Sequence, residues 1–208
     1  MNSRTESGYI NVKPEPSEFG SQHLLDSLAR LPSPEKYWIG FSGGADSTAL
    51  LLAMWECREK LPAPFHAVHF HHGLQDAADA WADHCSSFCK ERDIPFLSEK
   101  LEIVPVKRSS LEEEARNCRY RAVASVLSDQ EMYLTAHHAE DQAETLFLNL
   151  MRGSGVDGLS AMPESRPLGD GVLQRPLLGF QNSALRDYLG DNNIEWMEDP
   201  SNLYLNHD

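Results

Sequence analysis

The chain has 208 residues, 41% of them hydrophobic, which is enough to form one good core. Its formal net charge of −14 argues against a surface that binds nucleic acid throughout, because lysine and arginine normally supply that affinity. Any RNA partner must therefore be held locally. No segment approaches the roughly 18 uninterrupted apolar residues of a membrane span, and no secretion signal is recognisable. We expect a cytoplasmic protein without membrane association.

Residues 1–20 are polar, contain two prolines and show no periodicity, so we expect a flexible leader. Residues 21–190 alternate short apolar runs with helical patterns. Strands are predicted at 37–41, 65–70, 95–101 and 132–135, and helices near 46–60, 76–92 and 111–128. This alternation predicts an α/β fold with a doubly wound, mostly parallel sheet and helices on both faces. In such folds ligands bind beyond the carboxyl ends of the strands.

The remaining segments give weaker signals. Residues 162–182 are rich in proline and glycine and are predicted to loop back over the sheet, and residues 183–189 form a short helix. Residues 191–208 read as the start of a linker. The cysteines form no C-x-x-C pair, and Cys85 and Cys89 are expected on the core side of a helix. The sequence does not fix the oligomeric state and is compatible with a homodimer.

The first predicted strand runs into the sequence Ser-Gly-Gly-Ala-Asp-Ser at residues 42–47, and a helix follows. Glycines can adopt positive φ and let backbone N–H groups surround phosphate oxygens, and the helix adds its positive N-terminal end. Asp46 would repel a bare phosphate but suits a bridging Mg²⁺. A nucleotide triphosphate fits this pattern. The alternative is a Gly-Gly turn with a Ser/Asp helix cap. The residues predicted to bind ATP here are Ser42, Gly43, Gly44, Ala45, Asp46 and Ser47.

Three histidines follow the second predicted strand, at positions 69, 71 and 72. Their spacing lacks the companions that a zinc site requires. His69 and His71 are instead predicted to lie near the nucleotide, at the carboxyl end of the strand. A simpler role in capping the loop is the alternative.

The fourth predicted strand enters a helix that carries His137, Asp141 and Glu144 at its start. The two carboxylates share one face, which suits an ammonium group or a metal ion. Acidic residues are also favoured there by the helix dipole alone. The opposite face is predicted to pack on the core through Ala143, Leu146, Phe147 and Leu150.

Two basic positions complete the candidate set. Arg116 suits a substrate carboxylate, and its alternative is a solvated helix face. Arg152, Gly153 and Ser154 follow the acidic helix and offer a cation and free N–H groups for tRNA or phosphate. As a helix stop, this glycine needs no further function.

Taken together, the motifs resemble those of the tRNA(Ile)-lysidine synthetases, a group of PP-loop ATP pyrophosphatases. The similarity covers about residues 21–204 and rests on the ordered set SGGADS, H-x-HHGL, LEEEAR-x-x-RY, HHAEDQAET, RGSG-x-x-GL and EDPSN. It implies ligation of L-lysine to the wobble cytidine of tRNA(Ile) with a CAU anticodon, through an adenylated cytidine, with ATP and Mg²⁺. It also implies that Arg116, His137, Asp141 and Glu144 surround the lysine.

The resemblance further implies that Asp46, Asp141 and Glu144 are catalytic, and either Asp141 or Glu144 can be the general base. Family members usually continue with an arginine-rich stretch and tRNA-binding domains, so we expect this chain to be the N-terminal catalytic part. Two other functions stay open: a tRNA thiolase of the same loop family, which needs a persulfide or an iron–sulfur site, and a non-catalytic ATP-binding module.

Overall fold

The computed structural model describes residues 18–71, 78–101, 111–151, 153 and 161–198. Most of the predicted leader, the end of the predicted linker and His72 therefore lie outside the described residues. Within the described ranges one six-stranded sheet has the order β3-β2-β1-β4-β6-β5. The strands are β1 (Lys36–Gly40), β2 (Phe65–His71), β3 (Phe96–Lys100), β4 (Glu131–Leu134), β5 (Ser165–Leu168) and β6 (Gly171–Gln174).

Every strand pairing is parallel except that of β5 with β6. The prediction of a mostly parallel sheet is thus confirmed. The central strand β1 sets the register, because Tyr37 lies opposite Phe65 of β2 on one side and Met132 of β4 on the other. The chain runs outward from β1 to β3 and then returns to β4 on the other side of β1. The carboxyl ends of β1 and β4 thus flank the switch point where doubly wound folds bind ligands.

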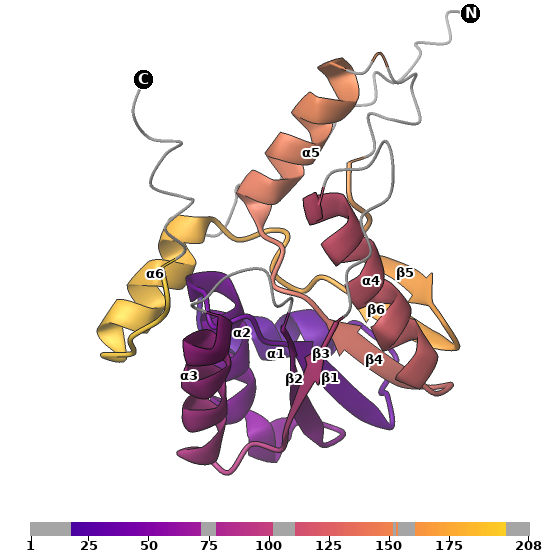
Figure 1. Ribbon diagram of the computed structural model, residues 1–208. Coiled ribbons are helices and arrows are strands. Elements are labelled where there is room, and N and C mark those ends of the chain that lie inside the picture. Colours follow the sequence, from indigo (N-terminus) through magenta and orange to yellow (C-terminus); the bar gives the residue numbers. More distant parts are fainter. Residues whose placement is uncertain (1–17, 72–77, 102–110, 152, 154–160, 199–208) are drawn as a thin grey trace, which may run out of the picture.

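Helices cover both faces of the sheet, as predicted (Figure 1). Successive strand residues point to opposite faces, so Ile39 and Ala67 join one core cluster and Val68 and Tyr133 the other. The first cluster also receives helices α1, α2, α3 and α6, and the second receives α4. The helices are α1 (Ser21–Leu28), α2 (Ala45–Glu56), α3 (Ala78–Lys90), α4 (Leu111–Val126), α5 (Ala139–Met151) and α6 (Asn182–Asp191), and a 3₁₀ turn η1 (Arg58–Lys60) follows α2.

The prediction of a loop over residues 162–182 is wrong. Strands β5 and β6 form an antiparallel hairpin that extends the sheet, and Leu168 pairs with Gly171 across a turn in which Gly169 has a φ of +59°. Pro167 is tolerated because β5 is an edge strand and needs no complete ladder of N–H donors. Four-residue strands interrupted by proline and glycine carry too little alternation to be recognised in the sequence.

The predicted core face of α5 is also wrong. Phe147 is 62% exposed and Leu150 52% exposed, and Ala143 is exposed as well. The beginning of α5 is anchored, because Ala139 N–H donates to Phe180 O and the Gln142 side chain bonds both the N–H and the C=O of Met162. From there the helix projects away from the sheet (Figure 1). The spacing of the apolar residues indicated which of them share a face of α5, but it did not indicate whether that face packs on the core.

Residues on both sides of the predicted domain contribute to its core. Phe19, expected in the leader, packs edge-on against Phe180 and Tyr188 with ring centroids 5.0 and 5.2 Å away. Ile194 and Trp196, expected in the linker, pack against the first core cluster. Cys85 and Cys89 are fully buried in that cluster, as predicted. Among the described residues, no helix has the length and apolar character needed to cross a membrane.

Candidate active site

The turn after β1 has the glycine-dependent shape that the sequence predicts, but only one glycine has a positive φ. Gly43 has a φ of +84°, whereas Gly44 is extended and forms the N-cap of α2. The Trp81 indole N–H donates to Ser42 O, which holds the turn against α3. The bend of the main chain therefore depends on Gly43.

The two serines of this turn bond mainly to the turn itself. Ser47 Oγ donates to Gly44 O at 3.1 Å and lies 3.2 Å from the Ser42 N–H, and the two hydroxyl oxygens are 3.0 Å apart. Ser47 is buried and Ser42 is exposed. Ser47 thus shapes the loop from inside, while Ser42 is the exposed member of the pair.

The first turn of α2 is suited to bind an anion. Ala45, Asp46 and Ser47 open this 12-residue helix, so their backbone N–H groups have no carbonyl partner within it. The helix dipole adds positive potential at the same place. The geometry can therefore accommodate a phosphate group between the turn and the helix start.

His69 and His71 lie within β2, and His69 is further from open space than the sequence suggested. His69 is buried, and its Nδ1 lies 2.9 Å from the carbonyl oxygen of Phe41, directly before the turn. This contact stabilises the end of β1 beneath the turn. His71 ends β2, and the structure does not describe its side chain.

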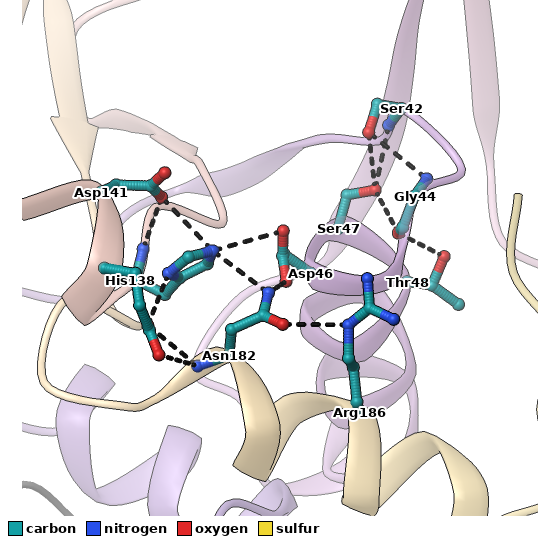
Figure 2. A network of polar contacts seen from close by, with 10 residues as sticks. Ser42, Gly44, Asp46, Ser47, Thr48, His138, Asp141, Asn182 and Arg186 are labelled. Carbon is teal, nitrogen blue, oxygen red and sulfur yellow. Dashed lines mark hydrogen bonds and ion pairs between the residues drawn. The ribbon is translucent and has the colours of Figure 1, made fainter. Parts of the chain in front are cut away.

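Asp46 is the centre of a polar network contributed by three separate segments (Figure 2). The Asn182 side-chain amide, at the start of α6, donates to Asp46 Oδ1 at 2.6 Å. His138, between β4 and α5, places its Nε2 3.5 Å from Asp46 Oδ2. Although burial lowers the pKa of His138, the carboxylates of Asp46, Asp141 and Glu140 together outweigh burial and raise it.

Asp141 joins this network and also caps its own helix. Its Oδ2 accepts a hydrogen bond of 2.9 Å from the His138 N–H and lies 3.7 Å from His138 Nε2. A carboxylate at the third helical position that binds the N-cap N–H is half of a capping box. The structure therefore brings Asp46 and Asp141 to the same nitrogen, Nε2, of the His138 imidazole. Glu144 lies exposed one turn further along α5 and forms no hydrogen bond or ion pair within the described ranges.

The network continues to residues late in the chain. Asn182 Oδ1 accepts from Arg186 Nε at 2.9 Å, and Arg186 binds Glu198 at 3.0 Å. The Met197 N–H donates to Gly43 O at 2.9 Å. The segment after α6 is thus bonded both to the acidic network and to the turn after β1.

On its other side the site is positively charged. His137 Nδ1 lies 2.8 Å from the Thr135 hydroxyl, and burial together with Arg175, Arg116 and Arg119 lowers the pKa of His137 to about 3. His137 is consequently neutral near pH 7. The predicted pair Arg116 and His137 is therefore close enough to interact electrostatically.

Three residues were predicted to contact tRNA or phosphate. Two of them, Arg152 and Ser154, are outside the described residues. Gly153 has a φ of +68° and its N–H donates to Leu150 O at 3.1 Å. The glycine therefore ends α5 as predicted.

Residues 18–208 match the PP-loop domain family. The chain belongs to this family. A tRNA(Ile)-lysidine synthase of Pseudomonas syringae is 46% identical over 181 residues, which cover 86% of this chain and 40% of the relative. The enzyme of the same name from Alkalilimnicola ehrlichii is 45% identical over 191 residues, or 92% of this chain and 43% of the relative. The chain thus spans less than half the length of these curated relatives.

A solved structure supports the fold of this PP-loop domain. The U34-tRNA thiolase NcsA of Methanococcus maripaludis superposes with a TM-score of 0.69 at 19% identity, over 86% of this chain and 65% of that one. At this identity the likeness concerns the fold. The PP-loop assignment supports the use of ATP, in agreement with the turn at residues 42–47.

Four polar residues of the PP-loop site were not predicted. His138 and Glu140 lie inside the HHAEDQAET motif, and their side chains face Asp46 and Asn182 respectively. The motif contained the signal, but the sequence could not tell which of the two adjacent histidines faces the carboxylates. Asn182 and Arg175 had no comparable signal, because a single Asn at a helix start and a single Arg after a strand are common.

The buried, neutral His137 should make the PP-loop domain sensitive to acid. An unfolded chain protonates this histidine at a pKa of about 6.5, whereas the folded chain does so at about 3. Stability should therefore decline as the pH falls from 6.5 towards 3, by at most about 1.4 kcal/mol per pH unit from this group. Urea unfolding across this range should show a flatter slope for His137→Gln.

The exposed His23 provides the control. His23→Gln should follow the wild-type slope. Equal slopes for wild type and His137→Gln would contradict the assignment of a buried neutral imidazole.

Proposed function

We propose that this chain is the catalytic part of a tRNA(Ile)-lysidine synthase. The observation that carries the proposal is the joining of the PP-loop residue Asp46 to Asp141 through His138, because it places the ATP turn and the acidic helix at one site. Relatives of that name match most of this chain. The enzyme would ligate L-lysine to C2 of the wobble cytidine in the CAU anticodon of tRNA(Ile), converting ATP to AMP and pyrophosphate.

In the first step, cytidine O2 attacks the α-phosphate of ATP and pyrophosphate leaves. The turn at residues 42–44 and the first N–H groups of α2 would hold the leaving phosphates. Asp46 and Asp141, which both face His138 Nε2, offer the hard oxygen ligands that Mg²⁺ prefers. When bound there, Mg²⁺ would neutralise charge on the phosphates. Positioning and electrostatics supply most of the catalysis in such transfers.

In the second step, the lysine amine attacks C2 of the adenylated cytidine, the C2–O2 bond breaks and AMP leaves. The amine must lose a proton, and Asp141 or Glu144 would accept it as general base. Asp141 already faces the network, whereas Glu144 lies at its open side. Arg116 and the neutral His137 would bind the lysine carboxylate.

The thiolase alternative is disfavoured by the state of three of the four cysteines; the fourth, Cys118, is half-buried and accepts a hydrogen bond from Arg121. Burial raises the pKa of Cys57 to about 11 and those of Cys85 and Cys89 to about 12, so these thiols are poor nucleophiles and metal ligands. Free cysteines also accord with the reducing cytoplasm, where we place the enzyme. Light scattering on the full chain would distinguish a monomer from a homodimer.

The proposal is tested by incubating the full-length protein with ATP, Mg²⁺, L-lysine and tRNA(Ile). We expect AMP release that depends on lysine and tRNA, together with a mass increase on the anticodon cytidine. AMP release that does not respond to lysine would refute the assignment. ATP binding without any AMP formation would instead favour a non-catalytic module.

Asp141→Asn should raise the lysine concentration needed for half-maximal activity by about 10- to 100-fold. The asparagine oxygen can still accept from the His138 N–H, so the helix start is preserved, but one negative charge for an ammonium group is lost. A charge-assisted hydrogen bond contributes about 1.5–3 kcal/mol, which corresponds to this range. The measurement is the KM for lysine at saturating ATP.

Asp83→Asn, an exposed change on α3, is the control and should leave this KM unchanged. If Asp141→Asn also leaves it unchanged, Asp141 does not bind the lysine.

A further inference from the structure

Arg175 is a buried cation that is not paired with any carboxylate of the described residues. It follows β6 directly, is 3% exposed and donates from Nη1 to Pro163 O at 2.6 Å. Its Nε has no hydrogen-bond partner, and no carboxylate within the described ranges forms an ion pair with it. A buried guanidinium normally requires such partners, because leaving a charge unpaired away from water costs several kcal/mol.

Two further guanidinium groups lie close to the same place. Arg116 of α4 and Arg166 of β5 have their guanidinium carbons 5.7 and 4.9 Å from the centroid of the Tyr120 ring. Tyr120 also interacts with Arg175. Three arginines, from α4, from β5 and from the position after β6, therefore converge on one tyrosine, in a chain with a net charge of −14. Helix α4 lies beside β5 and β6 (Figure 1).

The surroundings show the effect of this positive charge. Burial lowers the pKa of Arg175, and Arg166 and Arg116 add to the decrease, while Tyr120 opposes it. The neutral state of His137 has the same origin in part, since Arg175 and Arg116 both disfavour its protonation. An anion bound among these groups would relieve the mutual repulsion of the arginines.

The cluster occupies the end of the sheet where ligands are expected. Thr135, after β4, donates its N–H to Gln174 O, so the ends of β4 and β6 are level and His137 and Arg175 follow them directly. Asp46 follows the neighbouring strand β1. His137 and His138 are consecutive residues, and His137 is influenced by Arg175 and Arg116 while His138 contacts Asp46. The positive and negative halves of the site therefore adjoin each other at this pair of histidines.

We propose that Arg175, with Arg116 and Arg166 around Tyr120, forms a carboxylate subsite that selects the amino-acid substrate. This inference rests on the proposed function. The planar fork of a guanidinium matches a carboxylate in two parallel hydrogen bonds, which gives specificity as well as affinity. Burial of Arg175 favours a small carboxylate over the phosphates of an RNA backbone, which would approach from the surface. Arg175 is thus the buried member of the subsite and Arg116 the exposed one.

The test compares L-lysine with L-lysinamide, which replaces the carboxylate by a neutral amide. The full-length protein is assayed for AMP release at saturating ATP and tRNA(Ile), and kcat/KM is measured for each amine. We expect the wild type to prefer lysine by about 100-fold, in line with the loss of a charge-assisted hydrogen bond pair. Arg175→Gln should reduce this preference to within about threefold by raising the KM for lysine and leaving that for lysinamide unchanged.

Two further variants separate recognition from folding. Arg166 is only half-buried, so Arg166→Gln should fold normally and reduce the preference by about tenfold. Arg121→Gln removes an exposed arginine of the same helix α4 and should leave the preference intact. Affinity for tRNA should be unchanged in all three variants.

The possible results distinguish a failure of the carboxylate subsite from a failure of the proposed function. A wild-type protein that uses lysine and lysinamide equally well overturns the carboxylate subsite but leaves the proposed function standing. The same conclusion follows if neither Arg175→Gln nor Arg166→Gln changes the ratio of kcat/KM for lysine to that for lysinamide. It also follows if these variants lose only affinity for tRNA. A wild-type protein that uses neither amine overturns the proposed function itself.

Discussion

Replacing Asp46 with asparagine is expected to lower ATP-dependent AMP formation by about 100- to 1,000-fold while the fold survives. The magnitude is that of removing one group that stabilises developing charge. Asparagine has nearly the same shape and keeps an oxygen that accepts the 2.6 Å hydrogen bond from Asn182, so the network should persist without its negative charge. The measurement is kcat/KM for ATP over a series of Mg²⁺ concentrations, with the unfolding midpoint recorded for each protein.

The control is Asp187→Asn, which removes an exposed carboxylate from α6. This variant should match the wild type. A rate for Asp46→Asn that equals that of the wild type at every Mg²⁺ concentration would exclude Asp46 from the ATP and metal site.

Gly43→Ala should destabilise the protein by about 2–4 kcal/mol and abolish ATP binding. The left-handed conformation costs a non-glycine residue about 1–2 kcal/mol, and forced packing costs a similar amount. A Cβ atom at this position would lie 2.9 Å from Trp81 Nε1 and 3.0 Å from Cys85 Sγ, both on α3. Urea unfolding reports the first effect, and calorimetric titration with ATP reports the second.

The neighbouring glycine offers a matched comparison. Gly44 has a φ of −74°, and the nearest atom to an added Cβ is Ser42 Oγ at 3.7 Å. Gly44→Ala should therefore cost well under 1 kcal/mol in stability, within the range of an unstrained surface change. It should still weaken ATP binding, because the new methyl group occupies the approach of a phosphate to the turn. Equal stability losses at both positions would contradict this account of the turn.

The central part of the fold follows from hydrophobic periodicity and turn chemistry. Strands β1, β2, β3 and β4 and helices α2, α3 and α4 lie within a few residues of their predicted bounds, because buried parallel strands and amphipathic helices leave strong patterns. The hairpin of β5 and β6 was missed because Pro167 and Gly169 read as loop residues. These four-residue strands are held by pairing of β6 with β4, which is distant in sequence, and by burial of Leu168 and Leu173.

The candidate site, like the fold, could be predicted from the sequence only in part. Gly43, Asp46 and Asp141 could be predicted because each lies in a local pattern, namely a glycine turn or a helix start. The partners of Asp46 could not, since Asn182 is 136 residues away and reaches it only through tertiary packing. Arg175 could not be predicted either. Its importance lies in its burial and in its arginine neighbours, and no sequence pattern indicates either property.

The hydrogen bond from Met197 to Gly43 has a consequence for communication within the molecule. The carbonyl that it engages belongs to the residue whose left-handed backbone bends the turn after β1. Displacement of the segment around Met197 would therefore be transmitted directly to this turn. Such a tether offers a short mechanical route between the segment after α6 and the first residues of α2.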